Sequence, residues 1–162
     1  MTDSTIAVLD IDGTLIDSNY QHALAWYRAL RMVGETYPVW RLHRLIGMAS
    51  SAQRRHVDVF LDKLDARGIA DDWTSSADVE ASKPAPDLRQ VALKKLGAPP
   101  DASSVMVGDS VWDVEAAKRA GMPAIVVRSG GFGDDELQKA GAIAIYDTPG
   151  DLAKALEDTP LA

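Results

Sequence analysis

The sequence contains no cysteine, which excludes disulfides, thiolate metal sites and cysteine nucleophiles. Its apolar runs stay far below the ~18 residues that suggest a membrane span. The first residues, MTDSTIAVLDIDG, show neither the basic nor the apolar region of a signal peptide. Positive charge is in the minority, with 17 Lys and Arg against 24 Asp and Glu, and no basic cluster occurs. We therefore expect a cytoplasmic protein that binds neither nucleic acid nor membranes.

The composition is that of a globular chain able to bury a core. Of the 162 residues, 46% are apolar and 25% are charged, which are ordinary values for a folded protein. This length predicts one domain over residues 1–162. The sequence does not indicate an oligomeric state.

Short apolar runs alternate with helical patterns along the chain. Apolar, β-branched runs predict strands at 5–9, 104–107, 124–127 and 142–146. Helical spacing predicts helices at 20–33, 52–67, 88–96, 112–120, 134–140 and 151–157. The segment 35–51 is harder to interpret, because RLHRLIGMASS could form a short helix followed by a short strand over 45–49. The alternation predicts an α/β fold, a three-layer sandwich around a parallel sheet.

Carboxylates follow two of the predicted strands at the point where each strand ends. Asp10 and Asp12 come after the first strand, Asp109 follows the strand at 104–107, and Asp113 lies one helical turn further on. Ligands bind at the carboxyl ends of such strands, where these side chains would meet. One alternative is that the aspartates only cap the following helices. The other is a cation site, and oxygen ligands without nearby histidine suit Mg²⁺.

Three ordered segments make the sequence recognisable. DIDGTLID at 10–17 resembles the first motif of the haloacid dehalogenase (HAD) superfamily, SKPAPD at 82–87 its third motif, and GDSVWD at 108–113 its fourth. The resemblance implies a doubly wound, Rossmann-like core. It also implies a Mg²⁺-dependent phosphatase that hydrolyses a small phosphorylated metabolite through an aspartyl-phosphate intermediate.

The first motif then carries the proposed chemistry. By the resemblance, Asp10 is the nucleophile, and Asp12 is the general acid that later becomes the general base. An acid at position 12 also distinguishes the phosphatases and phosphomutases from the dehalogenating branch. Backbone N–H groups around Ile11 and Gly13 would bind the phosphoryl oxygens.

The resemblance also assigns the metal ligands and a cation. Mg²⁺ would be held by the carboxylates of Asp10 and Asp109 and by the backbone carbonyl of Asp12, with Asp113 helping directly or through water. Lys83 would neutralise charge on the phosphoryl oxygens. The alternative for Lys83, taken alone, is a solvated lysine on the surface.

The second motif is the least clear. The family places a serine or threonine at the end of the second strand, and Ser50 matches it best, with Ser51 beside it as a further phosphate contact. The alternative is that Ser50 or Ser51 is only the N-cap of the helix at 52–67.

The sequence departs from the family between its first two motifs. Only 32 residues lie between Asp17 and Ser50, whereas relatives with a helical cap have several dozen more. Residues 18–48 resemble the first part of such a cap, so we expect a reduced cap, as though a large internal segment were absent after Met48. If the chain is continuous, residues 45–49 must serve as the second strand.

Two further functions stay open. A phosphomutase of the same superfamily would use the same Asp10 and Asp12, and its product would be an isomerised sugar phosphate instead of inorganic phosphate. A non-catalytic binding or scaffold protein that has lost its cap is the alternative outside enzymes, and failure to bind Mg²⁺ would favour it.

Overall fold

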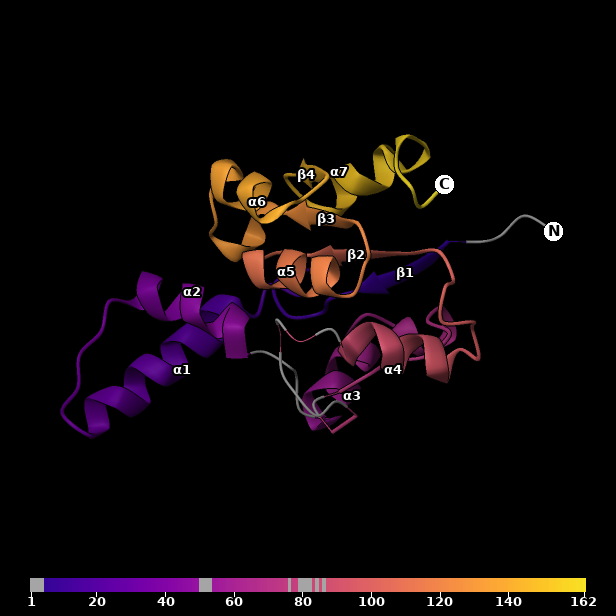
Figure 1. Cartoon of the computed structure of the whole chain (residues 1–162). Helices are drawn as coiled ribbons and strands as arrows, with labels where there is room; N and C mark the ends of the chain where they lie inside the picture. Colours follow the sequence, from indigo (N-terminus) through magenta and orange to yellow (C-terminus); the bar gives the residue numbers. More distant parts are fainter. Residues whose placement is uncertain (1–4, 50–53, 76, 79–82, 84, 86) are drawn as a thin grey trace.

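The computed structural model describes residues 5–49, 54–75, 77–78, 83, 85 and 87–162 (Figure 1). The strands are β1 (Ile6–Leu9), β2 (Ser104–Gly108), β3 (Ala124–Val127) and β4 (Ala144–Tyr146). The α-helices are α1 (Asn19–Met32), α2 (Val39–Ala49), α3 (Arg54–Lys63), α4 (Asp87–Lys95), α5 (Val111–Arg119), α6 (Asp134–Ala140) and α7 (Pro149–Lys154). Short 3₁₀ helices follow at Ala66–Gly68 (η1), Arg128–Gly130 (η2) and Leu156–Asp158 (η3).

The four strands form one parallel sheet in the order β1-β2-β3-β4. Its central strands β2 and β3 are buried along their whole length, as expected for continuous apolar runs covered on both faces. The predicted α/β fold with a parallel sheet is confirmed. Among the described strands the order does not reverse, and β1 lies at an edge of the sheet.

Helices cover both faces of this sheet. On one face, Met106 and Val126 pack with Val114 of α5 and Leu137 of α6. On the other face, Val105, Val107 and Ile125 of the sheet pack against Leu152 of α7. The core therefore lies between β2, β3 and their covering helices, which gives the three layers that the sequence predicts.

The predicted strand over 45–49 is wrong, because α2 continues to Ala49. The apolar run there does not alternate, and such a run does not distinguish a strand from a helix. Packing decides the outcome: Leu42 is buried against Ala23 of α1, with Val39 packed beside it. Helix formation is cooperative, so a first turn fixed in this way favours its own continuation.

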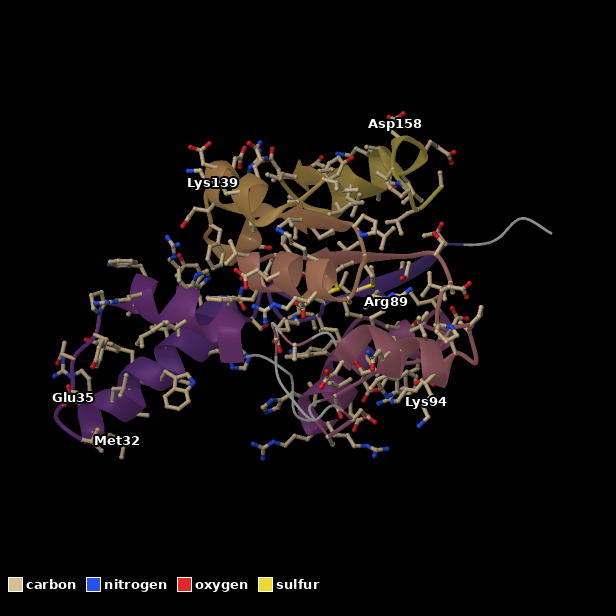
Figure 2. All side chains as sticks on the ribbon, viewed as in Figure 1. Met32, Glu35, Arg89, Lys94, Lys139 and Asp158 are labelled. Atoms are coloured by element: carbon tan, nitrogen blue, oxygen red, sulfur yellow. The ribbon has the colours of Figure 1, made fainter. Side chains whose placement is uncertain are left out.

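Helices α1 and α2 pack against each other and lie beside the carboxyl ends of the strands (Figure 1). Much of their remaining surface is apolar and exposed. Met32, labelled at the outer end of α1 in Figure 2, is 87% exposed, and Trp26 and Trp40 are also exposed. Among the described residues, no helix is long and apolar enough to cross a membrane.

Candidate functional site

The site forms where β1 and β2 end. The two strands pair in parallel with Leu9 opposite Val107, and the Asp10 N–H donates to the Val107 carbonyl over 2.8 Å. This register brings Asp10 and Asp109 to the same edge of the sheet, although 98 residues separate them in the sequence. The carboxylates of Asp10, Asp109 and Asp113 have oxygen atoms within 4.8 Å of one another, so the expected convergence occurs.

The turn after β1 needs a glycine at position 13. Gly13 has a φ of +84°, a conformation that L side chains rarely adopt. A Cβ there would lie 2.1 Å from Asn19 Nδ2 and 2.2 Å from Asp109 Oδ2. The Gly13 N–H, an expected phosphate donor, donates instead to the Ile16 carbonyl over 2.7 Å. The glycine therefore allows the turn to close tightly against Asp109.

Both carboxylate oxygens of Asp113 have partners. Its Oδ2 accepts hydrogen bonds from the Ser110 N–H (3.0 Å) and the Ser110 hydroxyl (2.6 Å), and these contacts cap the N-terminus of α5. Its Oδ1 forms an ion pair with Lys83 Nζ at 2.6 Å. A Cβ on Gly108 would lie 2.4 Å from Asp113 Cγ, so Gly108 makes room for this side chain. Asp113 therefore caps α5, which was the alternative to a role in a cation site, and it also belongs to the acidic cluster.

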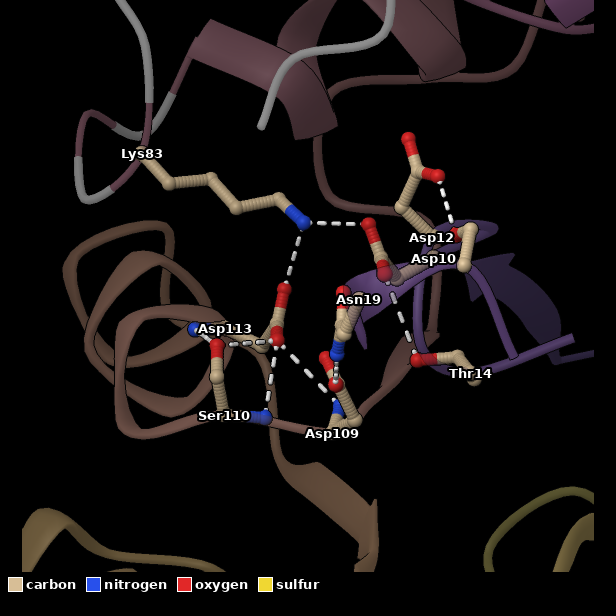
Figure 3. A network of polar contacts seen from close by, with 9 residues as sticks. Asp10, Asp12, Thr14, Asn19, Lys83, Asp109, Ser110 and Asp113 are labelled. Atoms are coloured by element: carbon tan, nitrogen blue, oxygen red, sulfur yellow. Dashed lines mark hydrogen bonds and ion pairs between the residues drawn. The ribbon is translucent and has the colours of Figure 1, made fainter. Parts of the chain in front are cut away.

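Lys83 is not a surface lysine. Its side chain is 9% exposed, and its ammonium group contacts both Asp10 Oδ1 and Asp113 Oδ1 (Figure 3). Burial alone would lower the pKa of Lys83, but the charges of Asp10 and Asp113 raise it above its usual range. Lys83 therefore stays protonated and places a positive charge directly beside Asp10.

Two carboxylates of this cluster, those of Asp10 and Asp109, resist ionisation. Burial raises the pKa of Asp109 to about 8, and the charges of Asp113 and Asp10 add to the shift. Burial also raises the pKa of Asp10 to about 6, against the opposing charge of Lys83. Three acids and one lysine thus leave negative charge without full compensation.

This donor set fits a hard divalent cation. The gathered ligand atoms of Asp10, Asp109 and Asp113 are all carboxylate oxygens, which Mg²⁺ prefers. The raised pKa values of Asp10 and Asp109 show that these carboxylates have too little positive charge beside them, and a divalent cation would supply it. The three side chains therefore could hold a metal ion.

Asp12 is buried and its carboxylate is not one of the three that gather. Its Oδ1 accepts a hydrogen bond from the Ser18 hydroxyl at 2.5 Å and lies 3.3 Å from His22 Nε2. Figure 3 shows the Asp12 carboxylate pointing away from the Asp109 side of the site. Asp10 and Asp12, two residues apart, therefore occupy separate environments.

Three further residues lie at the site, and the sequence motifs do not include them. Asn19, the first residue of α1, donates to Asp109 Oδ2 over 2.6 Å. The Ser129 hydroxyl donates to the Gly13 carbonyl. A Cβ on Gly130 would lie 1.9 Å from the Asp109 carbonyl oxygen. The Gly130-Gly131 pair was the one available signal, since it predicts a loop with unusual backbone geometry, and Gly131 has a φ of +74°.

Ser50 and Ser51, the candidates for the second motif, lie outside the described residues. The Thr14 hydroxyl lies beside Asp10 and donates a hydrogen bond to Asp10 Oδ2 over 3.2 Å.

Known proteins resemble this chain in sequence and in structure. A family model described as haloacid dehalogenase-like hydrolase matches residues 41–127. A phosphoglycolate phosphatase from Rhodospirillum rubrum is 37% identical over 87 residues, which cover 52% of this chain and 35% of that enzyme. The matched part therefore spans about a third of that curated relative.

Solved structures match over nearly the whole chain. A hydrolase from Pseudomonas syringae has a TM-score of 0.76 and 29% identity, covering 96% of this chain and 99% of the other. A HAD family hydrolase from Deinococcus radiodurans, with bound phosphate and sodium, has a TM-score of 0.74 and 18% identity, covering 99% and 98%. Because the sequence identity is low, the match to the Deinococcus radiodurans structure shows only that the two chains share a fold.

Proposed function

The chain belongs to the haloacid dehalogenase-like hydrolase family, and on that premise we propose that it is a Mg²⁺-dependent phosphatase for phosphate monoesters. The observation that carries the proposal is the environment of Asp10. This carboxylate contacts a buried lysine and lies within 4.8 Å of two further carboxylates. A nucleophile needs such a setting, because it must approach a phosphate anion of like charge.

Asp10, Asp109 and Asp113 would hold the ion. When bound, Mg²⁺ neutralises charge on the phosphoryl oxygens. The backbone carbonyl of Asp12 completes the ligand set that the family resemblance implies.

Asp10 attacks first. One of its carboxylate oxygens forms a bond to phosphorus while the bond from phosphorus to the ester oxygen breaks, which gives an aspartyl-phosphate. Lys83 is held beside Asp10 and neutralises developing charge on the phosphoryl group. Asp12 gives its proton to the departing ester oxygen, so the leaving group departs as a neutral alcohol.

Asp12 then acts as a base. It removes a proton from a water molecule whose oxygen attacks phosphorus, the bond from phosphorus to Asp10 breaks, and inorganic phosphate is released. The contacts with Ser18 and His22 support this role because they fix the orientation of the Asp12 carboxylate. Ser50 and Ser51 stay our candidates for hydroxyl contacts to phosphate, and Ile11 for a backbone donor.

We also propose that the chain is a single core domain over 1–162 in which residues 18–48 are the remnant of a helical cap. The exposed apolar side chains of Trp26, Met32 and Trp40 support this, because a complete cap would bury such a surface. A small phosphorylated metabolite is the substrate class, and phosphoglycolate is suggested by the name of one relative.

The test is phosphate release from an aryl phosphate, with and without Mg²⁺, for the wild type and Asp10→Asn. We expect Mg²⁺-dependent release that the substitution abolishes, while Asp101→Asn, at an exposed aspartate, serves as the matched control. Release that persists in Asp10→Asn would overturn the nucleophile assignment. A sugar phosphate substrate that is isomerised without release of phosphate would identify the phosphomutase. A folded protein that does not bind Mg²⁺ would favour the scaffold.

A further inference from the structure

The outer edge of β1 carries main-chain groups that no described residue pairs with. The Ile6 N–H donates to the Ser103 carbonyl over 2.9 Å, and the Asp10 N–H donates to Val107 of β2. Alternate residues of a paired strand direct their N–H and C=O groups to opposite sides. The N–H and C=O groups of Ala7 and Leu9 therefore point away from β2, to the side where the sheet has no further described strand. Such an edge is a template for another strand.

The sequence of β1 lacks the residues that commonly protect a sheet edge. Natural edge strands often carry charged side chains or proline, whereas β1 reads IAVL and its Leu9 side chain is 47% exposed. The opposite edge of the sheet is β4, which is one residue shorter and is followed by Asp147, held by Arg128. Of the two edges, that of β1 is therefore the more open to pairing.

This edge lines a cavity of about 560 Å³. All residues from Thr5 to Leu9 line the cavity, which gives it a length of about 13 Å along the strand. Helices α3 and α4 lie below β1 in the view of Figure 1, and with the segment between them they supply apolar side chains to the same cavity: Val57, Leu61, Leu64, Trp73 and Ala92. The cavity thus combines main-chain donors and acceptors with an apolar wall. An extended polypeptide matches both, through its backbone and its alternate side chains.

The charges that line the cavity favour a basic occupant. Its charged members in the described part of the chain are four aspartates and two lysines: Asp10, Asp12, Asp71, Asp72, Lys83 and Lys95. Both lysines already form ion pairs with aspartates. Asp71 is exposed and forms no ion pair with a described residue. Negative charge therefore exceeds positive charge along this wall, and a segment with lysine or arginine would complement it.

A second copy of this chain fits the edge poorly. Its own β1 would lie in the same kind of cavity beside α3 and α4, so the two edges could not approach each other. Each copy also has a net charge of −7, which opposes association of two acidic walls.

We propose that the cavity beside β1 is an acceptor site for an extended, basic segment of a partner protein. The segment pairs with the main chain of Ala7 and Leu9 as a further strand of the sheet, and its alternate apolar side chains pack against the wall formed by α3 and α4. The proposal goes beyond the phosphatase function and does not depend on it, because its hydrogen bonds are made by main-chain groups of β1.

The first test uses an acetylated and amidated heptapeptide in which valine alternates with lysine, titrated into the full chain by calorimetry. A peptide in which glutamate replaces each lysine is its matched control. We expect one molecule of the lysine peptide to bind per chain, and the glutamate peptide to bind at least tenfold more weakly. Binding of neither peptide, or equal binding of both, would overturn the proposal.

Proline substitutions then locate the binding edge. Ala7→Pro removes an N–H that points away from β2 and leaves the pairing of β1 with β2 in place. Ala144→Pro is the matched control on β4, because the neighbouring Ile143 donates to Ala124 of β3 and the Ala144 N–H therefore points outward. Ala7→Pro should weaken peptide binding by about tenfold, the upper range for one hydrogen bond, and Ala144→Pro should not. The reverse result would place the peptide on β4 and overturn the proposal.

Hydrogen exchange of the wild type tests the same pairing without any substitution. At saturating peptide, the amide protons of Ala7 and Leu9 should exchange at least tenfold more slowly, because they become hydrogen bonded. Those of Ala144 and Tyr146 on β4 should not change. Unchanged exchange at Ala7 and Leu9 would overturn the proposal even if Ala7→Pro failed to fold.

Two N-methylated forms of the lysine peptide test whether the occupant pairs as a strand. One form is methylated on the valine amides and the other on the lysine amides, and only one of these sets can face β1. We expect one form to lose binding and the other to keep it. Equal effects of the two would overturn strand pairing. Sedimentation of the wild type without peptide completes the test, since a dimer that Ala7→Pro dissociates would assign the edge to a second copy and overturn the proposal.

Discussion

The side-chain amide of Asn19 donates a hydrogen bond to Asp109 Oδ2 over 2.6 Å, which joins the start of α1 to the end of β2. This contact opposes the upward shift that burial imposes on the Asp109 pKa. Asn19 is therefore a positioning residue for a proposed metal ligand, and it lies in the segment that we propose as the cap remnant.

Replacing Asn19 with alanine should weaken Mg²⁺ binding by about 10–100-fold, the usual effect of removing a group that orients a metal ligand. Calorimetric titration with Mg²⁺ measures the change. Gln138→Ala, at an exposed amide on α6, is the control. Equal Mg²⁺ affinity in wild type and Asn19→Ala would show that Asp109 does not depend on this contact.

Gly13 and Gly34 form a matched pair, because their φ angles are +84° and +85°. Alanine at either position should cost about 1–2 kcal/mol in the free energy of unfolding, from the left-handed backbone. At Gly34 nothing lies within 4 Å of the added Cβ, whereas at Gly13 it would meet Asn19 and Asp109. We expect Gly13→Ala to lose Mg²⁺ binding and further stability, and Gly34→Ala to keep Mg²⁺ binding. Urea unfolding and calorimetry measure the two effects, and similar results for both variants would contradict the proposed clash.

The sequence predicts the convergence of acids because a simple rule covers it. Parallel strands present their carboxyl ends at one edge, so Asp10 and Asp109, each directly after an apolar run, are expected to meet. The motif resemblance adds Lys83 to the same site. The contacts of Ser18 and Asn19 are different, because they depend on where α1 begins relative to β2. No local pattern in the sequence records that relationship.

The conformation of residues 45–49, in contrast, is not predictable from the sequence pattern. These residues fit a buried strand or a helix equally well, and their conformation is decided by packing of α2 on α1. A cavity of about 560 Å³ lies along β1, and the sequence does not predict it either, because it is lined by side chains of α3 and α4 that come from distant parts of the chain.

Lys83→Met should destabilise the protein by about 3–5 kcal/mol, because it leaves buried carboxylates without their cation. Mg²⁺ should restore part of this loss, since the ion supplies charge to the same carboxylates. The contrast is Lys95→Met, where the lysine is more exposed and its ion pairs should be worth about 0–1 kcal/mol. Urea unfolding with Mg²⁺ and with a chelator measures both variants. A loss for Lys83→Met no larger than that for Lys95→Met would contradict the assignment of Lys83 to the buried cluster.

Stability without metal should decrease as the pH rises from about 4 to about 8. Burial, with the charges of Asp113 and Asp10, raises the pKa of Asp109 to about 8, and burial raises that of Asp10 to about 6. In this pH window the folded protein keeps protons that the unfolded chain has already released. Raising the pH therefore favours the unfolded state, and the free energy of unfolding falls until the pH exceeds the pKa values of the folded protein.

Saturating Mg²⁺ should flatten or reverse this dependence, because the bound ion favours the ionised carboxylates. It follows that Mg²⁺ affinity should itself increase with pH over the same range, as protons cease to compete for Asp109 and Asp10. Thermal unfolding at pH 5 and pH 8.5, with a chelator or with Mg²⁺, tests both statements. Asp109→Asn should reduce the pH dependence measured with the chelator. If that variant keeps the full pH dependence of stability, a group other than Asp109 titrates over this range, and the destabilisation does not arise at Asp109.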